Sequence, residues 1–320
     1  MFNGGLVENS YTTGHAKSER ARIGGIVGSL GDNSTIKKSY STVFIEAKNT
    51  TVGGLVAIMQ GNQGEIIESY STGSVKITSN NNGNYQAGGL VGLMIGNNTA
   101  IRNSYSVSSV EGGASRGGLV GSAGLFLNGI NFVLENTYAA GFVYSESLSS
   151  DGGLIGSTGG SINLDVINSY WDVNATNQSN SAGGGEGKTT YEMTTVPRPA
   201  SVYETWDFNN IWAQINGAYP WLGKLNEPVH LPDLVPTQFD YSELGYCDET
   251  CTVTIDGTVK NTGEATSSGF YIEIYDLTTD TIIDVIKATP LFPQEEFDFS
   301  VIYEDLQTMT HTIRMTVDSL

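Results

Sequence analysis

Short runs of apolar and polar residues follow one another along the first two thirds of the chain, without the 3.6-residue period of an amphipathic helix. The runs are rich in Val, Ile, Thr and Tyr, a composition typical of β-strands. Turn-forming pairs such as Gly61-Asn62 and Asn97-Asn98 separate them. This pattern predicts many short strands joined by tight turns.

Two landmarks recur together in this region. A glycine pair followed by two aliphatic residues occurs six times, and a hydroxyl residue with a tyrosine follows each copy. The glycine pairs begin at Gly4, Gly24, Gly53, Gly88, Gly117 and Gly152. The tyrosines are Tyr11, Tyr40, Tyr70, Tyr105, Tyr138 and Tyr170. A repeat of about 30 residues made of short strands predicts the stacked coils of a β-solenoid, since one such unit cannot bury its apolar face alone.

Fixed positions before each tyrosine sharpen this prediction. The residue four places earlier is always aliphatic and is expected to point into a core. The residue two places earlier is mostly asparagine, with one adjacent pair of opposite charge: Asn9, Lys38, Glu68, Asn103, Asn136 and Asn168. Equivalent residues of stacked coils lie about 4.8 Å apart. We therefore expect a stacked tyrosine column, an asparagine ladder and a Lys38–Glu68 contact, with the glycine pairs at tight corners that use positive φ and close backbone approach.

The repeat resembles the GLUG motif of bacterial and archaeal surface and secreted proteins, which include adhesins. The resemblance spans residues 4–172 and implies a right-handed parallel β-helix. Residues 173–225 are similar to the tail that closes such arrays, and the four tryptophans, Trp171, Trp206, Trp212 and Trp221, lie in or next to them. We expect this segment to be an aromatic C-terminal cap, because the open end of a solenoid would otherwise pair with other strands.

A second unit is expected after a linker at residues 226–232. Residues 233–320 contain 17 acidic and 3 basic residues, so they hold −14 of the total formal charge of −19. Their alternating strands predict an antiparallel β-sandwich. Residues 232–235 and 259–263 are similar to CARDB modules, immunoglobulin-like domains of prokaryotic surface proteins. The predicted fold class is therefore all-β, with a capped solenoid at residues 1–225 followed by an Ig-like sandwich.

Composition excludes several functions. Fifteen basic residues against 34 acidic ones make nucleic-acid binding very unfavourable. No apolar run reaches the 18 or so residues of a membrane helix, so we expect no membrane insertion within this chain. Its final residues fall in or just after a predicted strand, and we expect the chain to be a fragment of a longer polypeptide.

The two cysteines, Cys247 and Cys251, lie close together in the sequence, and in an oxidising compartment they favour a local disulfide over two reduced bystanders. Two thiols at this spacing lack the further ligands that a zinc site needs. We expect no cofactor. Acidic residues of the second unit leave calcium binding open, although they match no calcium-loop consensus: Asp276, Asp280, Asp284, Glu295 and Glu296.

Catalytic patterns are weak. Residues 182–189 match a relaxed phosphate-loop pattern, yet the sequence around them lacks the buried strand and long helix of a true phosphate loop. Carboxylate catalysis on polysaccharides is the main enzymatic alternative, because β-helices often carry it. The position three before each tyrosine shows no acidic or basic cluster across the coils, which argues against it.

These observations and resemblances favour a non-catalytic, extracellular or cell-surface protein that mediates attachment or acts as a scaffold. Its expected partners are a cell-surface glycan, a protein or copies of itself. A structural subunit of a self-assembling surface layer or filament is the first alternative, and a polysaccharide-active β-helix is the second.

Overall fold

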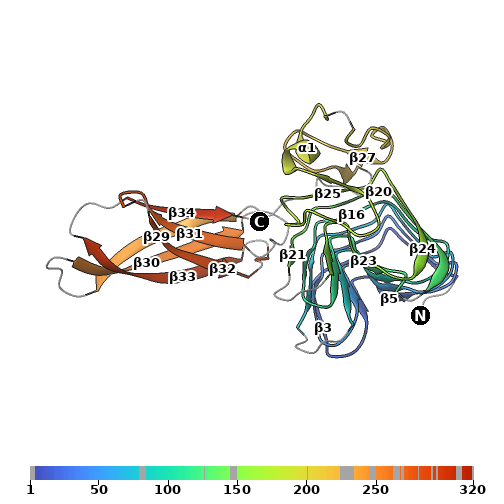
Figure 1. Ribbon diagram of the computed structural model, residues 1–320, viewed down its shortest axis with the longest axis horizontal. Helices are drawn as coiled ribbons and strands as arrows, with labels where there is room; N and C mark the ends of the chain where they lie inside the picture. The colour runs from blue at the N-terminus through green and yellow to red at the C-terminus, as the bar shows by residue number, and fades with distance from the viewer. Residues whose placement is uncertain are drawn as a thin grey trace. The chain divides into compact units, whose positions relative to one another are not determined.

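The computed structural model describes residues 4–78, 84–125, 127–144, 150–199, 201–223, 234–244, 250–261, 267, 270–279, 281–289, 291–292, 295–307 and 312–318. The chain forms two compact units, Met1–Val229 and His230–Leu320. Almost all regular structure is β-strand (Figure 1). Each unit is described here by itself.

The first unit is a parallel β-solenoid of about five turns, drawn from blue to green in Figure 1. Each turn passes through four sheets, here named B, C, D and A in the order in which the chain visits them. The part of sheet B that precedes the recurring tyrosine of each coil contains β1 (Leu6–Glu8), β6 (Thr35–Lys37), β11 (Glu65–Ile67), β16 (Thr99–Ser106), β20 (Asn128–Ala139) and β24 (Ser161–Ile167). The part that begins at the tyrosines contains β2 (Tyr11–Thr12), β7 (Tyr40–Ser41), β12 (Tyr70–Ser71), the ends of β16 and β20, and β25 (Tyr170–Asp172), with β26 (Glu186–Lys188) paired to β25.

The other three sheets have five parallel strands each. Sheet C contains β3 (His15–Ser18), β8 (Phe44–Ala47), β13 (Ser74–Ile77), β17 (Ser109–Glu111) and β21 (Val143–Tyr144). Sheet D contains β4 (Ile23–Gly24), β9 (Val52–Gly53), β14 (Gln86–Gly88), β18 (Ser115–Gly117) and β22 (Ser150–Gly152). Sheet A contains β5 (Val27–Leu30), β10 (Val56–Met59), β15 (Val91–Met94), β19 (Val120–Ala123) and β23 (Ile155–Thr158).

The aliphatic position four before each tyrosine builds the interior. Ile36, Ile66, Ile101 and Leu134 are in register on neighbouring strands of sheet B and are fully buried. Leucine and valine side chains that follow the glycine pairs, such as Leu55 and Val56, pack in the same apolar cluster. The repeat therefore places one apolar side chain from sheet B opposite sheet A in each coil, and stacking removes them from water.

The glycine pairs mark bends between sheets D and A, but positive φ is not the reason for glycine there. A Cβ on Gly54 would lie 2.0 Å from the carbonyl oxygen of Gly89 in the next coil, and no positive φ occurs at this glycine. Nearby, the hydroxyl of Ser71 donates to the same carbonyl at 2.6 Å. Glycine is thus required by the expected close approach of neighbouring coils, whereas the expected positive φ is found at Gly4 of the first pair and at none of the five later pairs.

The first glycine pair is not equivalent to the others. Leu6 and Val7 belong to β1 and pair with Thr35 and Ile36 in sheet B, whereas the aliphatic pairs of the later copies enter sheet A. Residues 4–7 therefore match the later copies in sequence but occupy a different place in the coil.

Two segments follow the last coil. Residues 173–188 run across its end, where the amide of Ala182 donates to Ile155 O and that of Gly153 donates to Asn180 O, both at 2.9 Å. Residues 190–222 instead pack beside sheet B and contain the helix α1 (Thr190–Thr194), β27 (Trp212–Ala213) and β28 (Trp221–Leu222). A capping box between Thr189 and Glu192 starts the helix.

The second unit has two antiparallel sheets of three strands, shown in orange and red in Figure 1. One contains β29 (Leu234–Leu244), β30 (Thr250–Asn261) and β33 (Glu296–Gln307), in that order. The other contains β32 (Thr281–Ala288), β31 (Phe270–Asp276) and β34 (Ile313–Asp318). Alternating side chains such as Ile255, Ile272 and Val301 form their shared apolar core. The alternating apolar residues of the sequence predict strands at residues 251–260, 269–275, 281–286, 297–302 and 311–317, which correspond to five of these strands, and do not predict β29.

Candidate functional site

A left-handed bend divides sheet B just before each tyrosine. The six residues there have φ between 45° and 52°: Asn9, Lys38, Glu68, Asn103, Asn136 and Asn168. Asparagine tolerates this conformation better than other residues with a side chain, so the recurring asparagine has a backbone cause. The ladder of side-chain bonds that we expected has one member among the described contacts, Asn136 Nδ2 donating to Asn103 Oδ1 at 3.2 Å. Lys38 Nζ and Glu68 Oε2 lie 4.0 Å apart.

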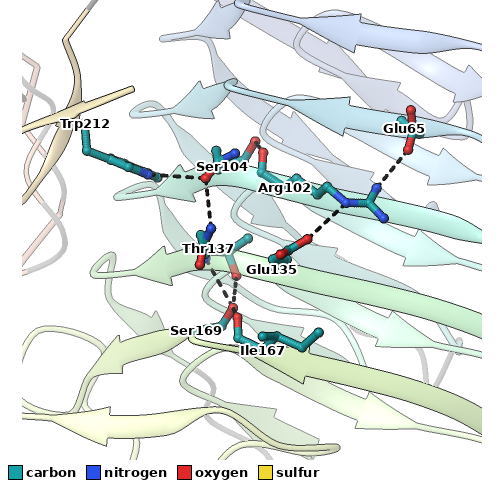
Figure 2. Close-up of polar contacts among 10 residues, drawn as sticks. Glu65, Arg102, Ser104, Glu135, Thr137, Ile167, Ser169 and Trp212 are labelled. Atoms are coloured by element: carbon teal, nitrogen blue, oxygen red, sulfur yellow. Dashed lines mark hydrogen bonds and ion pairs between the residues drawn. The ribbon is translucent and has the colours of Figure 1, made fainter. Parts of the chain in front are cut away.

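The hydroxyl residue next to each tyrosine links neighbouring coils. Ser39 Oγ accepts the amide hydrogen of Ser10 at 3.1 Å and donates to Lys37 O at 2.8 Å. Ser69 and Ser104 repeat both bonds, and Ser169 accepts the amide hydrogen of Thr137 at 3.2 Å (Figure 2). The hydroxyl thereby gives a backbone amide an acceptor, and it adds a second hydrogen bond to a carbonyl that already accepts an amide hydrogen from the neighbouring coil.

Five of the six ladder tyrosines stack face to face. Successive ring centroids from Tyr11 to Tyr138 lie 5.2, 4.9, 4.8 and 4.8 Å apart, with interplanar angles of at most 10°. Tyr219, from the segment after the solenoid, extends the column at 5.8 Å from Tyr138. Tyr170 is in register with Tyr138, but its ring meets Tyr203 edge-on instead. Because each face covers the next, the column presents mainly ring edges to its surroundings.

The lateral segment, residues 190–222, buries only one end of this column. Tyr11 is 63% exposed, whereas Tyr105 and Tyr138 are 2% and 0% exposed. Tyr138 donates its hydroxyl hydrogen to Pro220 O at 2.9 Å, and Trp206 Nε1 donates to Asn168 O at 2.9 Å. Burial raises the pKa of Tyr105 and of Tyr138 well above the usual range, and neighbouring tyrosines add to the rise. These phenols therefore stay neutral at any ordinary pH.

A buried carboxylate fixes the lateral segment to the last coil. Asp172 is 0% exposed, and it accepts the hydroxyl hydrogen of Tyr219 at 2.5 Å. It also accepts the amide hydrogens of Asn174 and Ala175 at 2.8 and 2.9 Å. Burial, followed by the Asp172 charge, raises the pKa of Tyr219 well above its usual range. The phenol thus remains a hydrogen-bond donor to the carboxylate.

Charged side chains on the coils pair in rows along the solenoid. Arg102 lies between Glu65 and Glu135, with N–O distances of 2.8 and 3.2 Å (Figure 2). In sheet C, the order from coil to coil is Lys17, Glu46, Lys76 and Glu111, with pairs at 2.7 and 3.0 Å. The hydrogen bond from Lys17 is the main cause that lowers the pKa of Glu46. These rows neutralise charge locally instead of concentrating one sign in a cleft.

A further ion pair lies inside sheet D. The Arg116 side chain is 0% exposed and reaches Asp151 at 2.6 Å, and Arg116 also donates to Gly113 O. Burial raises the pKa of Asp151, while the bond and charge of Arg116 oppose that rise. The pair joins two adjacent coils, since Arg116 and Asp151 are neighbours in register on β18 and β22.

Sequence reasoning missed a second polar row at the corner between sheets A and B. Its contacts run from Asp32 through the amides and side chains of four asparagines: Asn62, Asn97, Asn131 and Asn163. An Asp or Asn three or four places before each buried aliphatic residue was the available signal.

Two further sequence candidates are the phosphate-loop pattern and the cysteine pair. Glycines of the phosphate-loop pattern, Gly183 and Gly185, pack on Leu164 and Leu154 at the end of the solenoid. Cys247 and the side chain of Cys251 lie outside the described residues, so the disulfide stays a prediction.

Two of the calcium candidates make other contacts. Asp276 accepts the amide hydrogen of Thr278 at 2.8 Å, and Glu296 pairs with Lys260 at 3.0 Å. Asp280 lies outside the described residues. Within the ranges that the structure describes, no three His, Cys, Asp or Glu side chains gather as a metal site would require.

The fold and the rows of paired polar side chains together define a parallel β-solenoid protein whose polar side chains join neighbouring coils. No protein-family model matches the chain. It is similar to a protein of Evansella cellulosilytica that carries the name of a Gly-rich membrane protein, with 36% identity over 99 residues. That similarity covers 29% of this chain and 11% of the relative, so the chain spans only a small part of the relative's length.

In the parts of the chain that the structure describes, none of the helices is both long enough and apolar enough to span a bilayer.

Proposed function

We propose that this chain is a non-catalytic module of an extracellular or cell-surface protein, which mediates attachment or holds other modules as a scaffold. In this proposal the solenoid is a stiff stem with the GLUG-type repeat. The second unit, with two three-stranded antiparallel sheets around one core, is an immunoglobulin-like module of the CARDB type.

The pairing of charged side chains from coil to coil is the observation that carries this proposal. A polysaccharide-cleaving β-helix needs charged groups that converge on substrate from neighbouring coils. Here Arg102 spans Glu65 and Glu135, and the lysines of sheet C alternate with glutamates. Each pair is partly exposed and adds little to stability by itself, yet the alternation holds adjacent coils in register. Such use of charge suits a stem better than a catalytic cleft.

The tyrosine column also has a structural use. Sugars bind to the faces of aromatic rings, and in this column neighbouring tyrosines cover those faces at separations near 4.8 Å. The outermost ring, Tyr11, is the exception. Attachment would therefore use loops and outer surfaces presented by the stem rather than the column itself.

The experiment is a paired assay of binding and turnover on the whole 320-residue chain. Beads coated with the protein are presented to glycan and matrix-protein arrays, and the same protein is incubated with a panel of acidic and neutral polysaccharides. We expect retained ligand without release of oligosaccharides.

Two variants make the assay decisive. Glu65→Gln and Glu135→Gln remove the carboxylates beside Arg102, and binding to the arrays is expected to survive both changes. Release of sugars by the parent protein, abolished in either variant, would refute the proposal in favour of a polysaccharide-active enzyme. Absence of binding to every surface would leave the attachment role without support and count against it.

A further inference from the structure

A continuous set of aromatic rings runs from the tyrosine column into the lateral segment. Tyr70, Tyr105 and Tyr138 stack with ring centroids 4.8 Å apart, and Tyr219 continues the stack at 5.8 Å from Tyr138. The indole of Trp212 lies 6.0 Å from Tyr105 and 6.2 Å from Tyr138. Aromatic pairs at such separations are in contact. An electron removed from one ring of the set can therefore be replaced from its neighbour.

Two tyrosines of the column connect this set with solvent. Tyr40 and Tyr70 are only partly buried and stack on each other at 4.9 Å, whereas Tyr105 and Tyr138 are buried. A one-electron oxidant that meets the surface at Tyr40 or Tyr70 is thus joined to the buried rings through ring-to-ring contacts. The phenol that finally holds the oxidation must also release its proton, because the radical cation of a phenol is a strong acid.

A phenol at the buried end of the set has a carboxylate as its hydrogen-bond partner. Tyr219 donates its hydroxyl hydrogen to Asp172 Oδ2 at 2.5 Å. Tyr138 donates instead to the carbonyl oxygen of Pro220 at 2.9 Å, and the buried hydroxyl of Tyr203 makes no hydrogen bond within the described structure. A carbonyl oxygen is too weak a base to take the proton of an oxidised phenol, whereas a carboxylate at hydrogen-bond distance accepts it directly.

The charge balance of this pair favours loss of an electron. Asp172 is 0% exposed, and its side chain accepts the amide hydrogens of Asn174 and Ala175 besides the hydrogen of Tyr219. None of these partners is a cation, so the buried negative charge is costly. If one electron leaves Tyr219 and its proton moves to Asp172, a neutral carboxyl group and a neutral phenoxyl radical remain. The buried site loses its net charge, and burial therefore makes Tyr219 easier to oxidise.

From this geometry we propose that Tyr219 is a redox-active tyrosine, at which one-electron oxidation of the aromatic set comes to rest as a neutral phenoxyl radical. The oxidant is an oxygen- or peroxide-derived radical at the protein surface, and it gains the one electron that Tyr219 loses through the stacked rings. The O–H bond of Tyr219 breaks, and its proton forms a bond with Asp172 Oδ2. The column thereby collects oxidising equivalents from the surface and holds them at one buried site. This role does not depend on the proposed attachment function.

Electron paramagnetic resonance of the 320-residue chain after flash oxidation tests this proposal. A photo-oxidised ruthenium tris-bipyridyl complex serves as the one-electron oxidant. We expect a long-lived tyrosyl signal with a coupling to one hydrogen-bonded proton. This coupling should disappear only slowly in heavy water, because Tyr219 is 4% exposed. A tyrosyl radical at the surface would exchange its hydrogen-bonded proton at once and decay quickly.

Three variants locate the radical. Tyr219→Phe keeps a ring on Tyr138 but has no hydroxyl hydrogen to release, so the long-lived signal should be lost. Asp172→Asn keeps the size of the acceptor but removes the base, and any remaining signal should decay like that of a surface radical. The matched control is Tyr191→Phe, which removes a 73% exposed tyrosine of the lateral segment and should leave the signal unchanged. Near-ultraviolet circular dichroism checks that the aromatic packing persists in each variant.

Several results would overturn the proposal. A parent chain that forms only short-lived radicals with rapidly exchanging protons would do so without any substitution, and hence independently of whether a variant folds. An unchanged signal in Tyr219→Phe, a signal of parental lifetime in Asp172→Asn, or an equal loss in Tyr191→Phe would each do the same.

Discussion

The two ends of the solenoid carry the same repeat but end it differently. At the first coil, Tyr11 and Leu6 remain more than half exposed and the strands have one free edge among the described residues. At the last coil, a crossing segment covers the end and the lateral segment buries the neighbouring tyrosines. The repeat by itself does not determine where the solenoid ends, because each coil has backbone hydrogen-bonding groups on both edges. Closure needs residues that break the pattern.

One interior position shows which side chain ends the stack of coils. From Tyr40 on, the residue after each ladder tyrosine faces the second glycine of a pair, and from coil to coil it is Ser41, Ser71, Ser106, Ala139 and finally Trp171. Small residues leave room for the next coil to continue. Trp171 fills this space in the last coil, where a Cβ on Gly153 would lie 1.9 Å from its indole. A single large side chain at a position otherwise kept small thus marks the end.

The largest effect is expected for Trp171→Ala. The side chain is 7% exposed, packs in the main apolar cluster, and donates from Nε1 to Gln178 O at 2.9 Å. Its loss opens a cavity and frees a buried acceptor, at a cost of about 3–5 kcal/mol in the free energy of unfolding measured in urea.

The matched change is Ser41→Ala in the second coil, where Ser41 occupies the equivalent position, and it should cost about 1 kcal/mol or less. Equal losses in the two variants would show that closure does not depend on the tryptophan.

A smaller difference should separate two tyrosines of the same column. Tyr219→Phe removes the donor that lies 2.5 Å from the buried Asp172 carboxylate, and leaves a charge with fewer partners. We expect a loss of about 1–3 kcal/mol in thermal or urea unfolding. Tyr11→Phe at the exposed end should change stability by less than about 0.5 kcal/mol. If both variants behave alike, the Asp172–Tyr219 bond does not secure the lateral segment.

Sequence patterns predicted the fold where a residue has the same task in every coil. Aliphatic positions such as Ile66 and Ile101 have to be apolar in each turn, so their spacing predicts coils in parallel register, and the structure confirms a parallel β-solenoid. The antiparallel strands of the second unit were indicated in the same way, by alternation of buried and exposed side chains.

Other features depend on contacts between coils that the sequence pattern does not show. The pair at Gly4 resembles later pairs in spelling, yet its neighbours place it in sheet B. Position 54 needs glycine because the next coil lies too close for a Cβ, and not because of its own φ. This requirement becomes visible only when the coils are stacked. The tryptophans were expected to close an end, but Trp206 and Trp212 lie beside the tyrosine column, because the column offers a large aromatic surface there. Edge strand β29 was missed because its side chains, such as the 75% exposed Tyr241, do not follow the burial alternation.

The smallest expected difference in stability comes from substitutions at the left-handed bends. Near the closed end the bends hold asparagine, and Asn103 accepts hydrogen bonds from Asn136 and from Trp212 at 3.2 and 3.4 Å. In the second and third coils they hold Lys38 and Glu68 instead, which adopt the same positive φ and share a 4.0 Å ion pair, whereas the first coil again has asparagine, Asn9. Relief of backbone strain is worth about 1 kcal/mol for each bend, and the partly exposed ion pair about 0–1 kcal/mol. The double variant Lys38→Asn/Glu68→Asn should therefore raise the free energy of unfolding by about 1–2 kcal/mol, whereas Asn103→Lys should lower it by about 1–2 kcal/mol. A loss of stability in the double variant would mean that the ion pair, rather than the bend, decides these two positions.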